Sequence, residues 1–340
     1  MQLQWPLRRD PSVRYAQGGR MKVRGLMAVL ALGMASASTA QAPDPDSVFP
    51  TDAVMRQRYA LPGSKFATIA GEPLHYVDEG KGPAILLLHG SYASLRQWDD
   101  WARDLSKHYR VIRYDQSPAG LSGPSPVQDY SLDHRMAVID GLMDKLKIDR
   151  FVIVGTSSAG VPTTAYAATR PDRVIGMVAI NIAIARFPFD LSTMPKSLQE
   201  AAAEDRTHPT FHRPNFWRQI LLANVEDKTR VTPELVQQWT DLNNRALRDP
   251  EVGKASYAQI TPFSRSAEDL PKITAPTLIL WGRDDHETPL DTHGIPAFAA
   301  SGAKDKTLEL VPNCGHMVPL DCPARALERT LPFLQRITGR

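Results

Sequence analysis

The amino-acid sequence predicts an α/β fold, in which a mostly parallel sheet of eight strands is flanked by helices and interrupted by an inserted helical segment. Three observations support this prediction. Short β-rich runs alternate with stretches of helical periodicity. Most of these runs are apolar without alternation, which is typical of strands that helices cover on both faces. Residues 186–270 carry helical patterns but no clear strand pattern.

The chain has 340 residues, of which 42% are hydrophobic, so one large core is expected rather than several independent domains. We divide it into an N-terminal extension with signal peptide (residues 1–42), the first part of the core (43–185), a helical cap (186–270) and the second part of the core (271–340).

The predicted strands, in chain order, are Phe66–Ile69, Leu74–Asp78, Ala84–Leu88, Val111–Tyr114, Phe151–Val154, Val174–Ile180, Thr277–Leu280 and Thr307–Val311. The first two are close together and more polar than the rest, so they are expected to form an antiparallel hairpin at the sheet edge. Helical spacing of apolar residues predicts helices between the strands, at Leu95–Ser106, Leu132–Leu146, Ser158–Thr169 and Pro323–Ile337.

Residues 21–42 have the pattern of a secretory signal peptide. The cationic segment Met21–Arg24 precedes an apolar run at residues 25–33, and small residues follow. We expect translation to start at Met21 and cleavage to follow Ala40, because cleavage after Ala42 would leave Pro43 at the mature N-terminus. The apolar run is short for a membrane span, so the prediction is a periplasmic or secreted protein without a stable membrane anchor.

The charge distribution favours a small-molecule substrate. Residues 1–42 hold six of the 40 basic and one of the 37 acidic residues, which leaves 34 basic and 36 acidic residues in the body. Such a body offers no electrostatic footprint for nucleic acid. No dinucleotide-binding or P-loop glycine pattern and no Cys/His metal spacing is present, so no cofactor and no metal are expected. The sequence is compatible with a monomer or a homodimer.

The segment Phe151 to Gly160 carries the candidate nucleophile. An apolar strand runs directly into Gly155-Thr-Ser157-Ser-Ala159, followed by a helix. Small residues two positions before and after a serine let strand and helix approach closely, so the serine can adopt a strained backbone and project its hydroxyl. Ser157 is our candidate; Ser158 is the alternative, although Thr156 would crowd the turn around it.

A serine hydroxyl needs a base and a group that orients that base. His316 follows the last predicted strand in a Gly-His turn, which places it at the same sheet edge as Ser157. Asp284 and Asp285 follow the strand before it, and we choose Asp285 as the acid. Asn181 occupies the other strand end where an acid could stand, but an amide cannot supply the charge that stabilises an imidazolium.

Two backbone N–H groups are candidates for an oxyanion hole: that of Ser158, which follows the nucleophile, and that of Ser91, which follows His89-Gly90. Aromatic residues near this loop and in the cap are candidates for pocket walls, although cap aromatics can also form the cap's own core. The pocket candidates are Tyr92, Phe187, Phe216 and Trp217. Cys314 and Cys322 enclose His316, and their spacing leaves open whether they pair.

These motifs resemble the α/β-hydrolase superfamily in order and spacing. The resemblance runs from about Phe66 to the C-terminus and rests on His89-Gly90, Asp115-Gln-Ser-Pro-Ala-Gly120, Gly155-x-Ser157-x-Ala-Gly160, Trp281-Gly-Arg-Asp-Asp285 and Gly315-His316. Ala159 replaces the usual second glycine of the serine motif. The resemblance implies the α/β-hydrolase fold with a cap, and a triad in the order Ser157, Asp285, His316.

The superfamily hosts many reactions, so the resemblance alone leaves the activity open. Dehalogenases and epoxide hydrolases of this fold carry an aspartate where this chain has Ser157. The leading hypothesis is therefore hydrolysis of a carboxylic ester of a small or medium, largely apolar substrate through an acyl-enzyme. The alternatives are a lactonase, a carbon–carbon bond hydrolase that uses Arg186 or Arg213 to hold a substrate carboxylate, and a binding protein that has lost catalysis.

Overall fold

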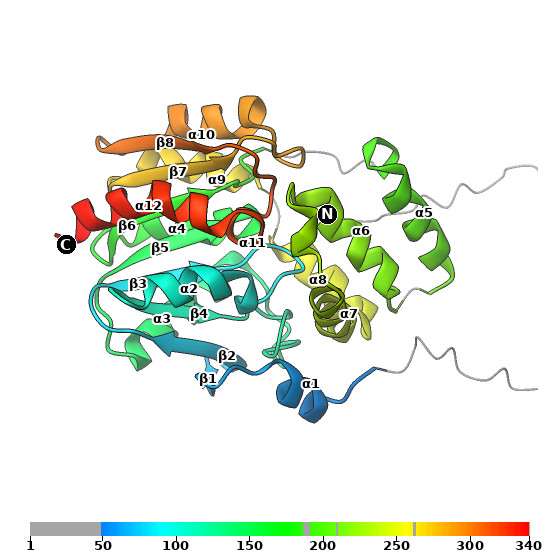
Figure 1. Cartoon of the computed structure of the whole chain (residues 1–340). Helices are drawn as coiled ribbons and strands as arrows, with labels where there is room; N and C mark the ends of the chain where they lie inside the picture. Colours follow the sequence, from blue (N-terminus) through cyan, green and yellow to red (C-terminus); the bar gives the residue numbers. More distant parts are fainter. Residues whose placement is uncertain (1–48, 186–190, 209, 261–262, 340) are drawn as a thin grey trace, which may run out of the picture. The chain divides into compact units, whose positions relative to one another are not determined.

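A computed structural model of the chain describes residues 49–185, 191–208, 210–260 and 263–339. Its centre is one eight-stranded sheet with the order β1-β2-β4-β3-β5-β6-β7-β8 (Figure 1). The strands are β1 Ser64–Ile69, β2 Glu72–Glu79, β3 Ala84–Leu88, β4 Arg110–Tyr114, β5 Phe151–Thr156, β6 Val174–Ile180, β7 Thr277–Gly282 and β8 Lys306–Val311. All eight predicted strands are confirmed, with ends that differ by one or two residues.

The pairing directions also agree with the sequence. β1 and β2 form the predicted antiparallel hairpin, and β2 continues antiparallel to β4. Every pair from β4 through β3, β5, β6 and β7 to β8 is parallel. The carboxyl ends of the six strands from β4 to β8 therefore meet at one edge of the sheet.

Apolar side chains of the parallel strands divide between two cores, one on each face. In β3, Leu86 and Leu88 belong to one cluster, whereas Ile85 and Leu87 belong to the other. Helices α3 (Leu132–Lys145), α4 (Gly160–Thr169) and α10 (Ile295–Ala300) contribute to the first cluster, and α2 (Asp99–Leu105) and α12 (Pro323–Thr338) to the second. Coverage on both faces explains why these strands read as continuous apolar runs.

The predicted helices are present, and their starts follow local chemistry. The Ser131 hydroxyl accepts a hydrogen bond from the His134 N–H at 3.2 Å and caps α3. The segment predicted as one helix from Leu95 begins instead with a 3₁₀ turn, η2 (Leu95–Trp98), which leads into α2. Short helices complete the core: α1 (Asp52–Tyr59), α9 (Ser264–Asp269) and α11 (Val318–Asp321).

The inserted segment forms a helical cap of α5 (Lys196–Glu204), α6 (Pro214–Asn224), α7 (Pro233–Leu247) and α8 (Pro250–Ile260), grouped together in Figure 1. Trp217, Leu221 and Trp239 are buried in a cluster that also includes Ala93 and Met317 of the core. Within the predicted cap range of residues 186–270, helix α9 packs on the core helix α4; the boundary at residue 270 stays a prediction.

Cys314 and Cys322 form a disulfide, with their Cα atoms 5.8 Å apart, which settles the pairing that the spacing left open. The predicted signal peptide lies outside the described residues. Within the described part of the chain, no helix is both long and apolar enough to cross a membrane.

The disulfide yields a stability prediction. The double variant Cys314→Ala/Cys322→Ala should lose about 2–3 kcal/mol of unfolding free energy, because the bridge closes a short loop and limits the unfolded chain. Urea denaturation of the variant and the oxidised wild type measures this loss. Reduced wild type is the matched control and should behave like the variant. Equal midpoints for all three samples would contradict the prediction.

Candidate active site

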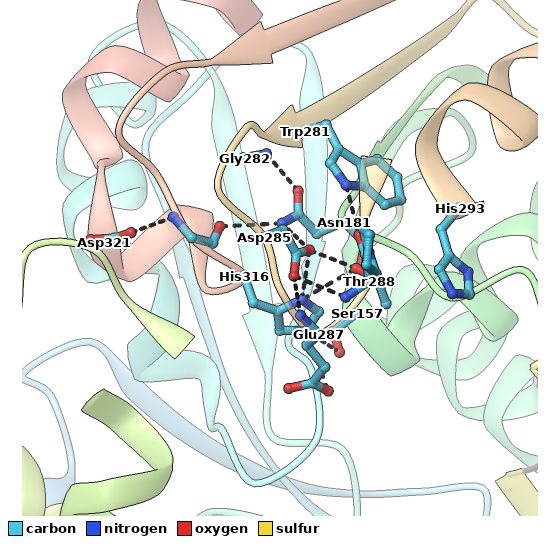
Figure 2. A network of polar contacts seen from close by, with 12 residues as sticks. Ser157, Asn181, Trp281, Gly282, Asp285, Glu287, Thr288, His293, His316 and Asp321 are labelled. Atoms are coloured by element: carbon cyan, nitrogen blue, oxygen red, sulfur yellow. Dashed lines mark hydrogen bonds and ion pairs between the residues drawn. The ribbon is translucent and has the colours of Figure 1, made fainter. Parts of the chain in front are cut away.

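Four neighbouring strands each deliver one polar residue to the same sheet edge (Figure 2). Ser157 directly follows β5, and Asn181 directly follows β6. Asp285 lies in the loop after β7, and His316 lies in the loop after β8. Because these strands are parallel neighbours, residues as far apart in sequence as Ser157 and His316 come into contact.

Ser157 stands at a sharp turn between β5 and α4 with φ of 53°, a conformation that side-chain-bearing residues rarely adopt. The small residues around it are required by close packing. A Cβ on Gly155 would lie 2.0 Å from the Thr163 hydroxyl oxygen, and one on Gly160 would lie 2.6 Å from the Ile182 Cβ. Ala159 keeps an ordinary backbone and is buried, so the glycine usual in this motif is not needed there.

A continuous hydrogen-bond chain joins the three predicted triad residues. The Ser157 hydroxyl lies 2.9 Å from His316 Nε2, and His316 Nδ1 donates to Asp285 Oδ2 at 2.9 Å. The two alternative residues lack these contacts. Among the described residues, the His316 ring bonds to the Ser157 hydroxyl and not to that of Ser158, and the Asp284 carboxylate accepts the Cys314 N–H at 3.3 Å. The geometry therefore favours Ser157 and Asp285.

Asp285 is buried, and its carboxylate is held by more groups than His316. Oδ2 also accepts from the Asn181 amide at 2.6 Å and from the Thr288 hydroxyl at 2.6 Å. Oδ1 accepts the backbone N–H groups of Glu287 and Thr288 at 2.8 and 2.9 Å. Burial acts to raise the pKa of Asp285, but His316 and these donors outweigh it, so the pKa lies below its usual value.

Asn181 contacts the candidate acid Asp285 directly, whereas in the sequence it stood out only as an amide at a position where an acid could stand. Its amide nitrogen donates to Asp285 Oδ2 and, at 3.2 Å, to the Gly315 carbonyl. Its carbonyl oxygen accepts the Gly282 N–H at 2.8 Å. Asn181 thus connects the ends of β6 and β7 to the loop of the base (Figure 2). Its place at a strand end beside the triad was the available signal.

Electrostatics around His316 favour its charged form. Burial lowers the pKa of the imidazole, but the carboxylates of Asp285 and Glu287 together with the Asp285 hydrogen bond outweigh burial and raise it to about 9. A ring protonated on both nitrogens cannot accept the Ser157 proton. His316 can therefore accept a proton only in the fraction of molecules whose ring has lost one of its two protons, and that fraction grows as the pH rises.

The loop after β3 lies against the nucleophile. A Cβ on Gly90 would be only 3.0 Å from the Ser157 Cβ. Buried His89 fixes this loop, because its Nδ1 donates to the Gly90 carbonyl at 2.8 Å and its Nε2 accepts the Gln116 N–H at 2.9 Å. The Ser91 N–H donates to no acceptor among the described residues and lies in an exposed turn, as an oxyanion donor requires.

The pocket candidates occupy different environments. Tyr92 is 39% exposed, and its ring centroid lies 5.6 Å from that of Trp217. Trp217 and Phe216 are buried within the cap cluster. Phe187 and Arg186 lie outside the described residues. Arg213, the other candidate for holding a substrate carboxylate, is 3.7 Å from Asp205 in an ion pair within the cap.

A disulfide and several hydrogen bonds fix the loop that carries His316. The disulfide Cys314–Cys322 closes it. The buried Asp321 carboxylate accepts the Gly315 N–H at 2.7 Å and the Glu226 N–H of the cap at 2.8 Å. The Met317 N–H donates to the cap residue Asn224 at 3.0 Å. The His316 loop is therefore in direct contact with the cap.

A second Ser-His-Asp arrangement lies elsewhere in the fold and joins β1, β2 and the loop after β4. Ser64 Oγ lies 2.7 Å from His75 Nε2, and His75 Nδ1 lies 2.7 Å from Asp115 Oδ2. Ser64 sits within β1 rather than on a strained turn, and its oxygen already accepts the Leu61 N–H at 2.8 Å. His75 and Asp115 are each only 1% exposed, so this arrangement fastens β1 and β2 to the loop after β4.

The chain is similar to known proteins over most of its length. The profile of the alpha/beta hydrolase fold matches residues 83–323 of this chain. That range runs from the start of β3 to the start of α12 and includes Ser157, Asp285 and His316.

Three similar proteins catalyse three different reactions, according to their names. A 2-hydroxy-6-oxo-6-phenylhexa-2,4-dienoate hydrolase of Comamonas testosteroni is 29% identical over 74% of this chain and 90% of its own. Haloalkane dehalogenase 2 of Mycobacterium tuberculosis is 29% identical over 74% and 88%. A monoacylglycerol lipase of Bos taurus is 27% identical over 76% and 77%. The relatives therefore indicate hydrolysis but not the bond that is cleaved.

The raised pKa of His316 predicts how Ser157 reacts with pH. The rate at which a fluorophosphonate labels Ser157 should rise with pH and level off above an apparent pKa of about 9. Mass spectrometry of the labelled protein measures the rate, and Ser157→Ala is the control that should take no label. A rate that is already constant at neutral pH would contradict the prediction.

Asn181 is predicted to position the acid. Asn181→Leu removes the donor to Asp285 and should slow labelling of Ser157 by about tenfold, since a hydrogen bond to a charged group contributes about 1.5–3 kcal/mol. Asn181→Gln, which keeps the amide but shifts it, serves as a comparison for geometry. If thermal unfolding changes while labelling does not, Asn181 has only a structural role.

Proposed function

This chain belongs to the α/β-hydrolase fold family, and on that premise we propose that it is a serine hydrolase that cleaves carboxylic esters through an acyl-enzyme on Ser157. The observation that carries the proposal is the hydrogen-bond chain from the Ser157 hydroxyl through His316 to buried Asp285. The strained backbone of Ser157 supports it, because such strain is typical of residues that a fold holds for reaction.

In the proposed reaction, neutral His316 takes the Ser157 proton on Nε2 while Oγ attacks the ester carbonyl carbon. The oxyanion of the tetrahedral intermediate receives hydrogen bonds from the backbone N–H groups of Ser91 and Ser158, each contributing about 3 kcal/mol to the barrier reduction. His316 then gives its proton to the leaving alcohol oxygen as the carbon–oxygen bond breaks. A water molecule, deprotonated by His316, releases the acid and restores the Ser157 hydroxyl.

Asp285 stays ionised throughout and holds His316 in the tautomer with its proton on Nδ1. The lowered pKa of Asp285 supports this role, because the carboxylate then stays charged across the working range of the base. No step requires a cofactor.

The identity of the nucleophile argues against dehalogenation. Dehalogenases of this fold attack with a carboxylate, and this chain has the Ser157 hydroxyl at the elbow. Similarity to a haloalkane dehalogenase therefore supports the fold rather than that reaction. Similarity to a monoacylglycerol lipase is compatible with ester cleavage.

Carbon–carbon bond hydrolysis is the second candidate, and similarity to the Comamonas testosteroni hydrolase favours it. The dienoate in that protein's name carries a carboxylate. Such a group needs a cation near the site. Of the two candidates, Arg186 lies outside the described residues and Arg213 pairs with Asp205 at 3.7 Å, whereas among the described residues His316 is flanked by the carboxylates of Asp285 and Glu287. This surrounding charge favours the ester.

We also propose that the chain is exported with Gln41 as the first mature residue. The signal-like pattern of residues 21–40 and the disulfide Cys314–Cys322 support export, because disulfides persist in oxidising compartments. Mass spectrometry of the mature N-terminus from the periplasm or medium tests this proposal, and a chain that retains residues 21–40 would contradict it.

Ester cleavage is tested with p-nitrophenyl esters from acetate to decanoate. The wild type should show a burst of p-nitrophenol followed by steady turnover, and Ser157→Ala should lose about a thousandfold or more of that turnover. Ser158→Ala, the matched control, changes a neighbouring hydroxyl but keeps the backbone donor and should retain its burst.

Each remaining outcome has a distinct meaning. Turnover that persists in Ser157→Ala but vanishes in Ser158→Ala would move the nucleophile by one residue. A wild type that cleaves no ester but accepts fluorophosphonate would favour the lactone or carbon–carbon alternatives. A wild type that does neither would favour a binding protein.

A further inference from the structure

Glu287 stands beside the reacting atoms without a part in the proposed mechanism. It lies two residues after Asp285, and its backbone N–H donates to Asp285 Oδ1 at 2.8 Å. This bond belongs to the same turn that fixes the acid, so the position of Glu287 follows from that of Asp285. Its side-chain carboxylate comes within 3.7 Å of His316 Nε2 and remains 27% exposed (Figure 2).

The two carboxylates near His316 lie next to different nitrogens of the imidazole ring. Asp285 binds Nδ1, whereas Glu287 approaches Nε2, the nitrogen that exchanges protons with Ser157. His316 Nε2 must also deliver its proton to the leaving oxygen, so the leaving group has to pass next to this nitrogen. Glu287 is therefore placed on the leaving-group side of the site.

Tyr92 adds an aromatic surface to the same side. It follows Ser91 in the loop beside Ser157; the residue as a whole is 39% exposed, and its ring centroid lies 5.6 Å from that of Trp217. The covered part of the phenol has a pKa raised by burial and, further, by the negative charge of Glu287, which indicates that the two side chains lie near each other. A carboxylate beside an aromatic ring is a suitable surface for a cation and an unfavourable one for an anion.

We propose that Glu287 is a specificity-determining residue that rejects esters with an anionic leaving group and favours those with a cationic one, such as an alcohol that bears a quaternary ammonium group. This proposal rests on the proposed ester hydrolysis. Asp285 is negative, and burial lowers the pKa of His293, so neither offsets the charge of Glu287. His316 itself pairs with Glu287 when it is protonated, but it is neutral in the form that accepts the Ser157 proton, so in that form Glu287 keeps its negative charge unpaired by the base.

The size of the effect follows from Coulomb's law. Two unit charges about 6 Å apart near a protein surface interact strongly enough to change a rate about ten- to a hundredfold. Part of this effect is screened by salt, because Glu287 is partly exposed. The discrimination should therefore weaken as the ionic strength rises.

The test uses three butyrate esters whose leaving groups differ mainly in charge: phenol, 3-carboxyphenol and 3-(trimethylammonio)phenol. We expect kcat/KM of the wild type to rank cationic above neutral above anionic. In Glu287→Gln the ratio of anionic to neutral kcat/KM should rise about tenfold or more, and the cationic advantage should fall by a similar factor. Release of each phenol is followed by chromatography.

Asp291→Asn is the matched control, because it also removes one negative charge but from an exposed residue of η8 (Leu290–Gly294) for which no contact with Ser157, Asp285 or His316 is found among the described residues. It should leave the ratios between the three esters as in the wild type. Glu287→Asp, which keeps the charge on a shorter side chain, should retain part of the discrimination. A ratio that is the same in the wild type and Glu287→Gln overturns the proposal.

Fluorophosphonate titration of Ser157 separates the two proposals. Labelling and ester turnover with unchanged charge ratios would overturn the role of Glu287 and leave ester hydrolysis standing. Absence of both labelling and turnover would overturn ester hydrolysis and, with it, the role of Glu287.

Discussion

The parallel pairing of β5, β6, β7 and β8 determines which residues meet at the candidate active site. These strands are neighbours in the sheet in the same order as in the chain, so each contributes a residue at its end or in the loop that follows to one row. Ser157, Asn181, Asp285 and His316 form that row. A shift of one strand by a single residue would turn its end residue to the other face and break the hydrogen-bond chain.

The base depends on a second layer of support. His316 sits in a loop without regular structure, and the Cys314–Cys322 bridge, the Asp321 carboxylate and the cap residue Asn224 together hold it. Two of these contacts belong to or reach the cap, so the cap and the core together fix the loop of His316.

The sequence predicted the fold and the strand ends well, because continuous apolar runs and the Gly155-to-Gly160 turn are local signals. It placed Asn181 at a strand end near the triad but could not predict the contacts of Asn181 and Glu287 with Asp285 and His316, since these depend on side-chain direction at the sheet edge. It could not show that α9 packs on α4, because a helical pattern does not reveal which neighbour a helix contacts. It also left the pairing of Cys314 with Cys322 undecided, since a spacing gives no Cα distance.

The arrangement of Ser64, His75 and Asp115 bears on how active sites are recognised in unfamiliar chains. Its hydrogen bonds are as short as those of Ser157, His316 and Asp285, so a geometric search for Ser-His-Asp triples would return both. What separates them is the serine: Ser64 lies within β1 and its oxygen already accepts a backbone N–H, whereas Ser157 stands on a strained turn. One molecule thus contains two Ser-His-Asp arrangements with similar hydrogen-bond lengths, so the setting of the serine, and not those lengths alone, identifies a candidate triad.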